Sequence, residues 1–343
     1  MRRPPGIVAA AVALAVAVVA SSCARDPVAD PKPSADAGPA TLGDAAVDQS
    51  GCRGLTVRRP GDQLTWIQGN ELRAPDGCLV RFPDGEVRGL AWNAAGDRFL
   101  VEGPGGATVI GAEARVELGT ERQWQWAGDD LLGRDDGGLV VRRPGGGDET
   151  VPIDGRIGRF AILPDHRTIV GEATVGGLSG LYLLTIATGE AERLVDVAAD
   201  TTEDIHATAD GNVVWSSTDE GADTTTLRRL EVASRAVTEL ASGPRFNGIF
   251  AATSETDAAV LAWSSGGGCG DDSVVVQATV GDRTEVVRGL PGTAQPVDWL
   301  PDGTLLLIDR GRSCDDSPGT LWSWKDGVVS RVADLVMDVA ARP

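Results

Sequence analysis

The chain has 343 residues, of which 42% are hydrophobic, so it is able to form a packed core. Its 50 acidic residues outnumber its 31 lysines and arginines, and the formal charge of −19 argues against nucleic acid as a partner and against a polybasic membrane-binding patch. The 45 glycines, roughly twice the usual share, indicate many tight turns and therefore β-structure.

The first 22 residues are typical of an export signal. Arg2 and Arg3 are followed by an uninterrupted apolar run from Ile7 to Ala20, which has about the length of a signal core and is short for a membrane span. The segment Ala20-Ser21-Ser22-Cys23 resembles the lipobox of bacterial lipoproteins. The resemblance implies that Cys23 carries a diacylglyceryl group and holds the protein on the outer face of the cell membrane. An ordinary cleaved signal with a chance cysteine is the alternative.

Residues 23–51 are predicted to be a tether between this lipid anchor and a folded domain that spans residues 52–343. The segment has few large apolar side chains and contains several prolines, so it cannot bury enough surface to fold. Its prolines are Pro27, Pro31, Pro33 and Pro39.

A repeated unit begins near residue 52, with an apolar strand, a tight polar turn and three further strands. The first turn of each unit contains an aspartate, because aspartate and glycine suit tight hairpins. These aspartates are Asp62, Asp97, Asp129, Asp165, Asp210, Asp257 and Asp302. Their spacing is about 35 residues in the first half and about 45 in the second. No segment of the mature chain has a sustained helical period.

The repeats predict an all-β protein, a β-propeller with seven four-stranded blades, although six or eight blades also fit. Two segments compete for the innermost strand of the first blade, residues 55–60 and residues 337–343. We assign the C-terminal segment to it, so the first blade is built from both ends of the chain and the C-terminal strand closes the propeller.

Three segments resemble the WD40-like repeat of TolB-type propellers. They are Ile162–Val170, Gly180–Glu190 and Val297–Gly303, and the last repeats the opening of the first. The resemblance implies a propeller fold and a function in binding other proteins.

Four cysteines follow Cys23, and an even number in an exported protein suggests disulfide bonds. Of the three pairings, propeller geometry favours Cys269 with Cys314, because both fall between the second and third strands of adjacent blades. Cys52 with Cys78 then follows by elimination. Free thiols are the alternative.

The longer repeats of the second half predict longer loops on one face, at Ala173–Gly180, Ser216–Thr226, Ser264–Ser273 and Asp309–Thr320. Insertions of this kind usually lie on the binding face of a repeat protein, and neutral drift is the alternative. Two of these loops carry paired carboxylates after a cysteine, and these are Asp271, Asp272, Asp315 and Asp316. They form the candidate binding face for a basic partner. The alternative of a calcium site is weaker, because the spacing matches no known calcium loop.

We expect a non-catalytic module that binds a protein or an envelope component, with no cofactor. No Walker loop, nucleophile elbow or His-Glu-x-x-His motif occurs. His166 and His206 stand alone and are expected to be structural. The alternative function is a metal-dependent propeller hydrolase or lactonase, which would need several polar ligands at the axis, whereas the inner strands are mostly apolar.

Overall fold

The computed structural model describes residues 51–343, except for 56–57, 83–86, 104, 113–114, 120–122, 136–137, 145, 199–200, 220, 222–223, 245–249, 255, 258–259, 266–273 and 312–316. The chain divides into two compact units, Met1–Gly38 and Pro39–Pro343, and the described residues belong to the second. The signal, the tether, Cys23, Cys269, Cys314 and the four candidate aspartates lie outside the described residues.

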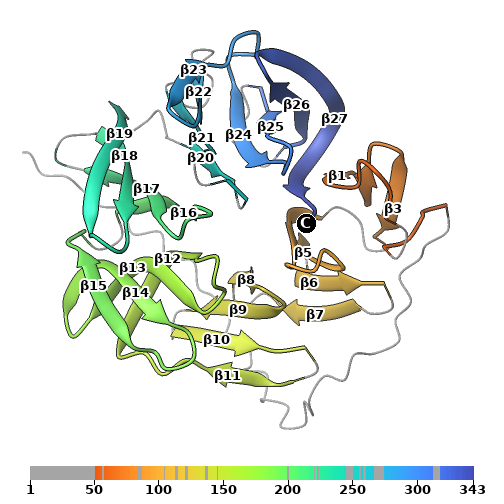
Figure 1. The fold of residues 1–343 in the computed structure, drawn as a ribbon. Coiled ribbons are helices and arrows are strands. Elements are labelled where there is room, and N and C mark those ends of the chain that lie inside the picture. The colour runs from red at the N-terminus through yellow and green to blue at the C-terminus, as the bar shows by residue number, and fades with distance from the viewer. Residues whose placement is uncertain are drawn as a thin grey trace, which may run out of the picture. The chain divides into compact units, whose positions relative to one another are not determined.

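All regular elements of the described residues are strands, and five separate four-stranded antiparallel sheets follow one another along the chain (Figure 1). The first two are β4 (Arg88–Trp92), β5 (Arg98–Gly103), β6 (Gly106–Gly111), β7 (Arg115–Gly119), and β8 (Gln123–Ala127), β9 (Asp130–Asp135), β10 (Gly138–Arg142), β11 (Asp148–Thr150). The third and fourth are β12 (Gly155–Ile162), β13 (Thr168–Val175), β14 (Leu178–Thr185), β15 (Ala191–Val195), and β16 (Thr202–Ala207), β17 (Val213–Asp219), β18 (Thr224–Glu231), β19 (Ala236–Pro244). The fifth is β20 (Phe250–Thr253), β21 (Val260–Ser265), β22 (Val275–Val280), β23 (Arg283–Val286). Together with a sixth sheet they make a β-propeller, as expected.

The sixth sheet joins the two ends of the described chain and has seven strands, in the order β24-β25-β26-β27-β1-β2-β3. Its strands are β1 (Leu64–Gln68), β2 (Glu71–Ala74), β3 (Gly77–Arg81), β24 (Ala294–Trp299), β25 (Leu305–Asp309), β26 (Gly319–Lys325) and β27 (Val328–Ala341). The prediction of seven separate four-stranded sheets is wrong in this form. The reason is the 14-residue strand β27, which pairs with β26 along its first part and with β1 along its last (Figure 1).

The predicted pairing of the C-terminal segment with the first strand of the chain is confirmed, with Ala340 opposite Thr65 and Val339 opposite Trp66. The penultimate residue locks this pairing. The Arg342 side chain is only 2% exposed and donates to the carbonyl oxygens of Gly96 (2.8 Å) and Leu55 (3.0 Å). Its guanidinium also lies 4.6 Å from the ring centre of Trp92. The end of the chain is therefore bound to two different sheets.

Six of the seven turn aspartates lie between the first and second strands of their repeats, whereas Asp62 lies just before β1, whose neighbour β27 comes from the other end of the chain. Asp165 shows the local reason, since one carboxylate oxygen accepts the backbone N–H groups of Arg167 and Thr168, both at 2.9 Å. Asp302 accepts the N–H of Thr304 in the same way. Such bonds satisfy backbone groups that the two strands cannot pair.

Tryptophans at equivalent positions of the repeats pack between sheets. Those of the second strands are Trp66, Trp215 and Trp263, and those of the first strands are Trp92, Trp126 and Trp299. All of them are buried except Trp126, which is half-buried at the edge of the cavity described below.

Two of the four predicted long loops are wrong. Strand pairing continues through Ala173–Gly180 up to Val175 opposite Leu178, and through Ser216–Thr226 up to Asp219 opposite Thr224. The extra residues of these repeats therefore lengthen the hairpins. Their β-branched side chains explain this: Thr218 and Thr225 share a hydrogen bond of 2.9 Å across the second hairpin.

No helix among the described residues has the length and apolar character required to cross a membrane.

Candidate functional site

The innermost strands enclose a cavity of about 1790 Å³. Six first strands contribute to its wall, and these are β4, β8, β12, β16, β20 and β24. The wall is mostly polar in the second half of the chain, where β16 supplies Glu203, Asp204 and His206, and β24 supplies Asp298. The expectation that the inner strands are mostly apolar is therefore wrong for β16.

His206 and Asp204 form an ion pair on β16. They are two residues apart on an extended strand, so their side chains lie on one side, and Nε2 of His206 is 2.7 Å from a carboxylate oxygen of Asp204. Burial alone would lower the pKa of His206, but the charge and hydrogen bond of Asp204 and the nearby charge of Asp298 outweigh it and raise the pKa. Burial opposes ionisation of Asp204, but His206 and the N–H groups of Ile205 and Ala251 lower its pKa overall. The pair thus favours the protonated imidazole beside an ionised carboxylate.

Three aspartates of the inner strands connect neighbouring strands through the backbone. Asp298 accepts the N–H of Trp299 on one oxygen and, on the other, the N–H of Ala341 in β27, both at 2.7 Å. Asp338 repeats the arrangement, accepting Val339 N–H at 2.9 Å and, at 2.7 Å, the N–H of the next inner strand, at Leu90.

The third of these aspartates is Asp204, which accepts the N–H groups of Ile205 and of Ala251 in the next inner strand. Each of the three strands has a register shift near its aspartate. A β-bulge interrupts the regular ladder there, and we infer that the carboxylate satisfies N–H groups that the bulge leaves unpaired. Asp204 and Asp298, which line the cavity, therefore have a structural role in its wall, and Asp338 has the same role in β27.

The β12 side of the cavity carries the opposite charge. Arg156 and Arg159 are both exposed and line the cavity. Arg156 precedes the register shift between Ile157 and Phe160, and Arg159 lies within it. Gly171 on β13 lets β12 and β13 approach closely at this shift, because a Cβ on Gly171 would stand 2.6 Å from the Cβ of Phe160. The cavity wall is thus basic on β12 and acidic on β16 and β24.

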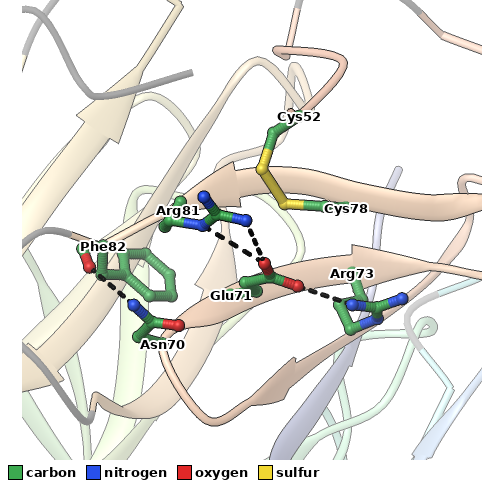
Figure 2. The surroundings of a disulfide bond; sticks show 7 residues. All are labelled: Cys52, Asn70, Glu71, Arg73, Cys78, Arg81 and Phe82. Atoms are coloured by element: carbon green, nitrogen blue, oxygen red, sulfur yellow. Dashed lines mark hydrogen bonds and ion pairs between the residues drawn. A yellow bond between two sulfur atoms is a disulfide. The ribbon is translucent and has the colours of Figure 1, made fainter. Parts of the chain in front are cut away.

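The predicted Cys52–Cys78 disulfide is present, with the two Cα atoms 4.8 Å apart (Figure 2). It fixes the entering chain beside β3, where Arg53 N–H donates to the carbonyl of Cys78 and Gly54 N–H to that of Leu79. Beside the disulfide, Glu71 accepts hydrogen bonds from Arg73 and Arg81 (Figure 2). These bonds, the one from Arg81 first, lower the pKa of Glu71 in spite of its burial.

The described residues bring together one group of potential metal ligands. The one group of three whose ligand atoms lie within 4.8 Å of one another is Cys52, Glu71 and Cys78, and two of these are joined in the disulfide. The candidate binding face of Asp271, Asp272, Asp315 and Asp316 and the Cys269–Cys314 pairing fall outside the described residues and stay predictions.

Sequence reasoning missed the basic side of the cavity and treated His206 as an isolated residue. The Asp204-Ile205-His206 spacing carried a signal, because alternate residues of a strand share a face. The position of Arg156 and Arg159 on a shared wall depends on a bulge and on Gly171. No sequence pattern predicted the bulge or the role of Gly171.

No family model matches the chain, and no curated protein matches it. Several solved structures do. An oligogalacturonate lyase in complex with manganese is 12% identical over 79% of this chain and 85% of that chain, with a TM-score of 0.55. A structure from a study of two prolyl endopeptidases is 13% identical over 74% of this chain and 42% of that chain, with a TM-score of 0.52. The putative TolB from Agrobacterium tumefaciens is 12% identical over 81% and 90% of the two chains, with a TM-score of 0.47. At these identities the comparisons show the fold, a β-propeller, which proteins of different activities share.

Proposed function

We propose that this protein is a non-catalytic binding module, a β-propeller exported from the cell and anchored to the membrane through Cys23, and that its ligand or partner enters the central cavity. The observation that carries the proposal is the cavity of about 1790 Å³, whose wall presents charges of both signs. A concave site with a few converging polar groups is the usual form of a binding site.

The residues of the wall favour binding over covalent catalysis. Among the described residues that line the cavity there is no serine, cysteine or lysine, the side chains that most often act as nucleophiles. His206 is bonded to Asp204, and Asp298 accepts two backbone N–H groups. The carboxylates of Asp204 and Asp298 therefore already have partners. These contacts use part of the hydrogen-bonding capacity of each group, and a metal-dependent hydrolase is the alternative.

We also propose that the seven-stranded sheet acts as two neighbouring blades, which makes seven blades in all. The support is the division of β27, since residues up to Val336 pair with β26 and residues from Val336 onward pair with β1. The second part of β27 contacts β24 and β4, as an innermost strand between two others would.

The binding proposal is tested by photo-crosslinking in the native envelope. A photoreactive residue replaces Gln125, which is exposed on β8 and lines the cavity, and a control replaces Val328, which is 64% exposed at the start of β27 and does not line it. We expect a specific product from position 125 alone. Equal products from both positions, or a product from position 328 alone, would contradict a binding site in the cavity.

Two further measurements separate the remaining parts of the proposal. Cys23→Ala is expected to release the protein from the membrane fraction or to block its maturation, because the variant lacks the cysteine that would carry the lipid anchor. Metal analysis after dialysis is expected to find none in stoichiometric amount. One retained equivalent that is lost in His206→Gln would favour the metal-dependent hydrolase instead.

A further inference from the structure

Arginine side chains in this protein nearly always have a partner. Among the described residues, only Arg156, Arg159, Arg167 and Arg288 have a cationic side chain that makes neither an ion pair nor a side-chain hydrogen bond. The chain has 50 acidic residues for 31 basic ones, so partners are abundant. Two of the exceptions, Arg156 and Arg159, lie on the same strand and line the same cavity.

The backbone of β12 is shaped to present both arginines on one wall. They are three residues apart, and in a regular strand side chains three apart lie on opposite faces. The register shift between Ile157 and Phe160 changes this relation, and residues on both sides of the shift line the cavity. Gly171, opposite Phe160, allows the shift, because a Cβ at Gly171 would stand 2.6 Å from the Cβ of Phe160.

Two acids that line the same cavity make no ion pair with these arginines. Asp204, on the neighbouring inner strand β16, pairs with His206. Glu172, opposite the bulge on β13, accepts the backbone N–H of Thr202 at 3.1 Å. Both acids thus have other partners, and neither guanidinium group makes an ion pair with a described acid.

We infer that the cavity binds a ligand that carries oxyanion groups, carboxylate or phosphate, and that Arg156 and Arg159 hold them. The inference rests on the proposed function, since it gives the ligand class of the same cavity. Guanidinium groups form forked hydrogen bonds with both anions, and water is a poorer partner inside a cavity than on an open surface. The acidic wall of β16 and β24 repels an anion, so the ligand lies toward β12.

The test uses small probes with two separated negative charges, because the arginines are roughly 10 Å apart along an extended strand. Pyrophosphate represents phosphate ligands, glutarate represents carboxylate ligands, and glutaramide is the uncharged counterpart of glutarate. Binding to the folded protein is measured by calorimetry at low ionic strength, where charge-dependent binding is strongest.

The variant Arg156→Gln/Arg159→Gln is compared with Arg167→Gln/Arg288→Gln. Both pairs lose two unpartnered arginines and change the net charge equally, but Arg167 and Arg288 do not line the cavity. We expect the first pair to weaken binding of pyrophosphate or glutarate at least tenfold and the second pair to change it less than twofold. Circular dichroism and thermal unfolding confirm that both variants fold.

The outcomes are distinct. Binding of pyrophosphate alone assigns phosphate, binding of glutarate alone assigns carboxylate, and binding of both supports an oxyanion site without further preference. No binding of either probe, binding of glutaramide equal to glutarate, or an equal loss in both variant pairs would overturn the inference. A specific crosslink at position 125 together with any of these results would leave the proposed binding function standing and remove only the ligand class.

Discussion

The carboxylate of Asp338 accepts a 2.7 Å hydrogen bond from the backbone N–H of Leu90, a residue 248 positions earlier in the chain. This bond links the last strand, β27, to β4, the first strand of the next sheet. Asp298 makes the same bond to Ala341 one strand earlier. The order of inner strands is therefore held at its closing point by side chain to backbone bonds between strands that do not share a ladder.

The first prediction concerns Asp338→Asn. Burial raises the pKa of Asp338, in spite of the N–H groups of Val339 and Leu90 and the charge of Arg310. Asparagine keeps the size of the side chain but has one acceptor oxygen, so one of the two N–H groups loses its partner. We expect a loss of about 1–3 kcal/mol in the free energy of unfolding, measured by urea denaturation. Asp326→Asn, at a turn with φ of 50° that asparagine tolerates, is the control and should be neutral.

Arg342→Met tests the lock at the C-terminus. The variant keeps much of the buried volume but loses the bonds to Gly96 and Leu55 and the contact with Trp92. We expect a loss of roughly 1–3 kcal/mol, because the buried carbonyl oxygens of Gly96 and Leu55 lose their donor, and faster proteolysis near both ends of the folded domain. Arg331→Met removes an arginine that is 59% exposed and should have little effect. Equal losses in both variants would mean that Arg342 does not hold the closure.

The disulfide is predicted to stabilise the domain substantially. Cys52 and Cys78 are 26 residues apart, for which loop-closure models give about 3 to 4 kcal/mol. The double variant Cys52→Ala/Cys78→Ala is expected to unfold at a correspondingly lower denaturant concentration. Non-reducing peptide mapping should recover Cys52 joined to Cys78 and, as the sequence predicts, Cys269 joined to Cys314. Any crossed pairing would contradict the strand assignment.

The ion pair of His206 predicts a pH-dependent stability. The pKa of His206 in the folded protein is raised above its ordinary value of 6.5, so protonation favours the folded state. This contribution is complete below pH 6.5 and is lost as the pH rises through the folded pKa. His206→Gln should therefore be more destabilising at about pH 5.5 than at about pH 9. A difference that is the same at both values, or larger at high pH, would show that His206 is not held as a cation.

Leu335 occupies a strained position in β27. Its φ is 56°, in the left-handed region, and its side chain is 65% exposed, so packing does not compensate the strain. Asparagine tolerates this backbone better than leucine. Leu335→Asn should raise the free energy of unfolding by up to about 1 kcal/mol, whereas Leu335→Ala should not. Thermal unfolding of the two variants side by side distinguishes strain relief from simple removal of an exposed apolar group.

The sequence by itself determined the all-β propeller class, the placement of the repeated turns, the C-terminal closure and the Cys52–Cys78 bond. These follow from local chemistry and from counting, because turn aspartates such as Asp165 bond their own backbone and repeat at nearly regular intervals.

Only the tertiary structure decided how the remaining parts are arranged. The continuous strand β27 merges two sets of strands into one sheet, and long hairpins replace two expected loops, because strand pairing extends wherever side chains can match across it. The cavity wall likewise depends on contacts between residues far apart in sequence. Arg156 and Arg159 share a wall because Gly171 lets a bulge form, and Asp204 does not neutralise them because it pairs with His206. The alternation of residues along one strand does not show which of its side chains pair with residues elsewhere in the fold.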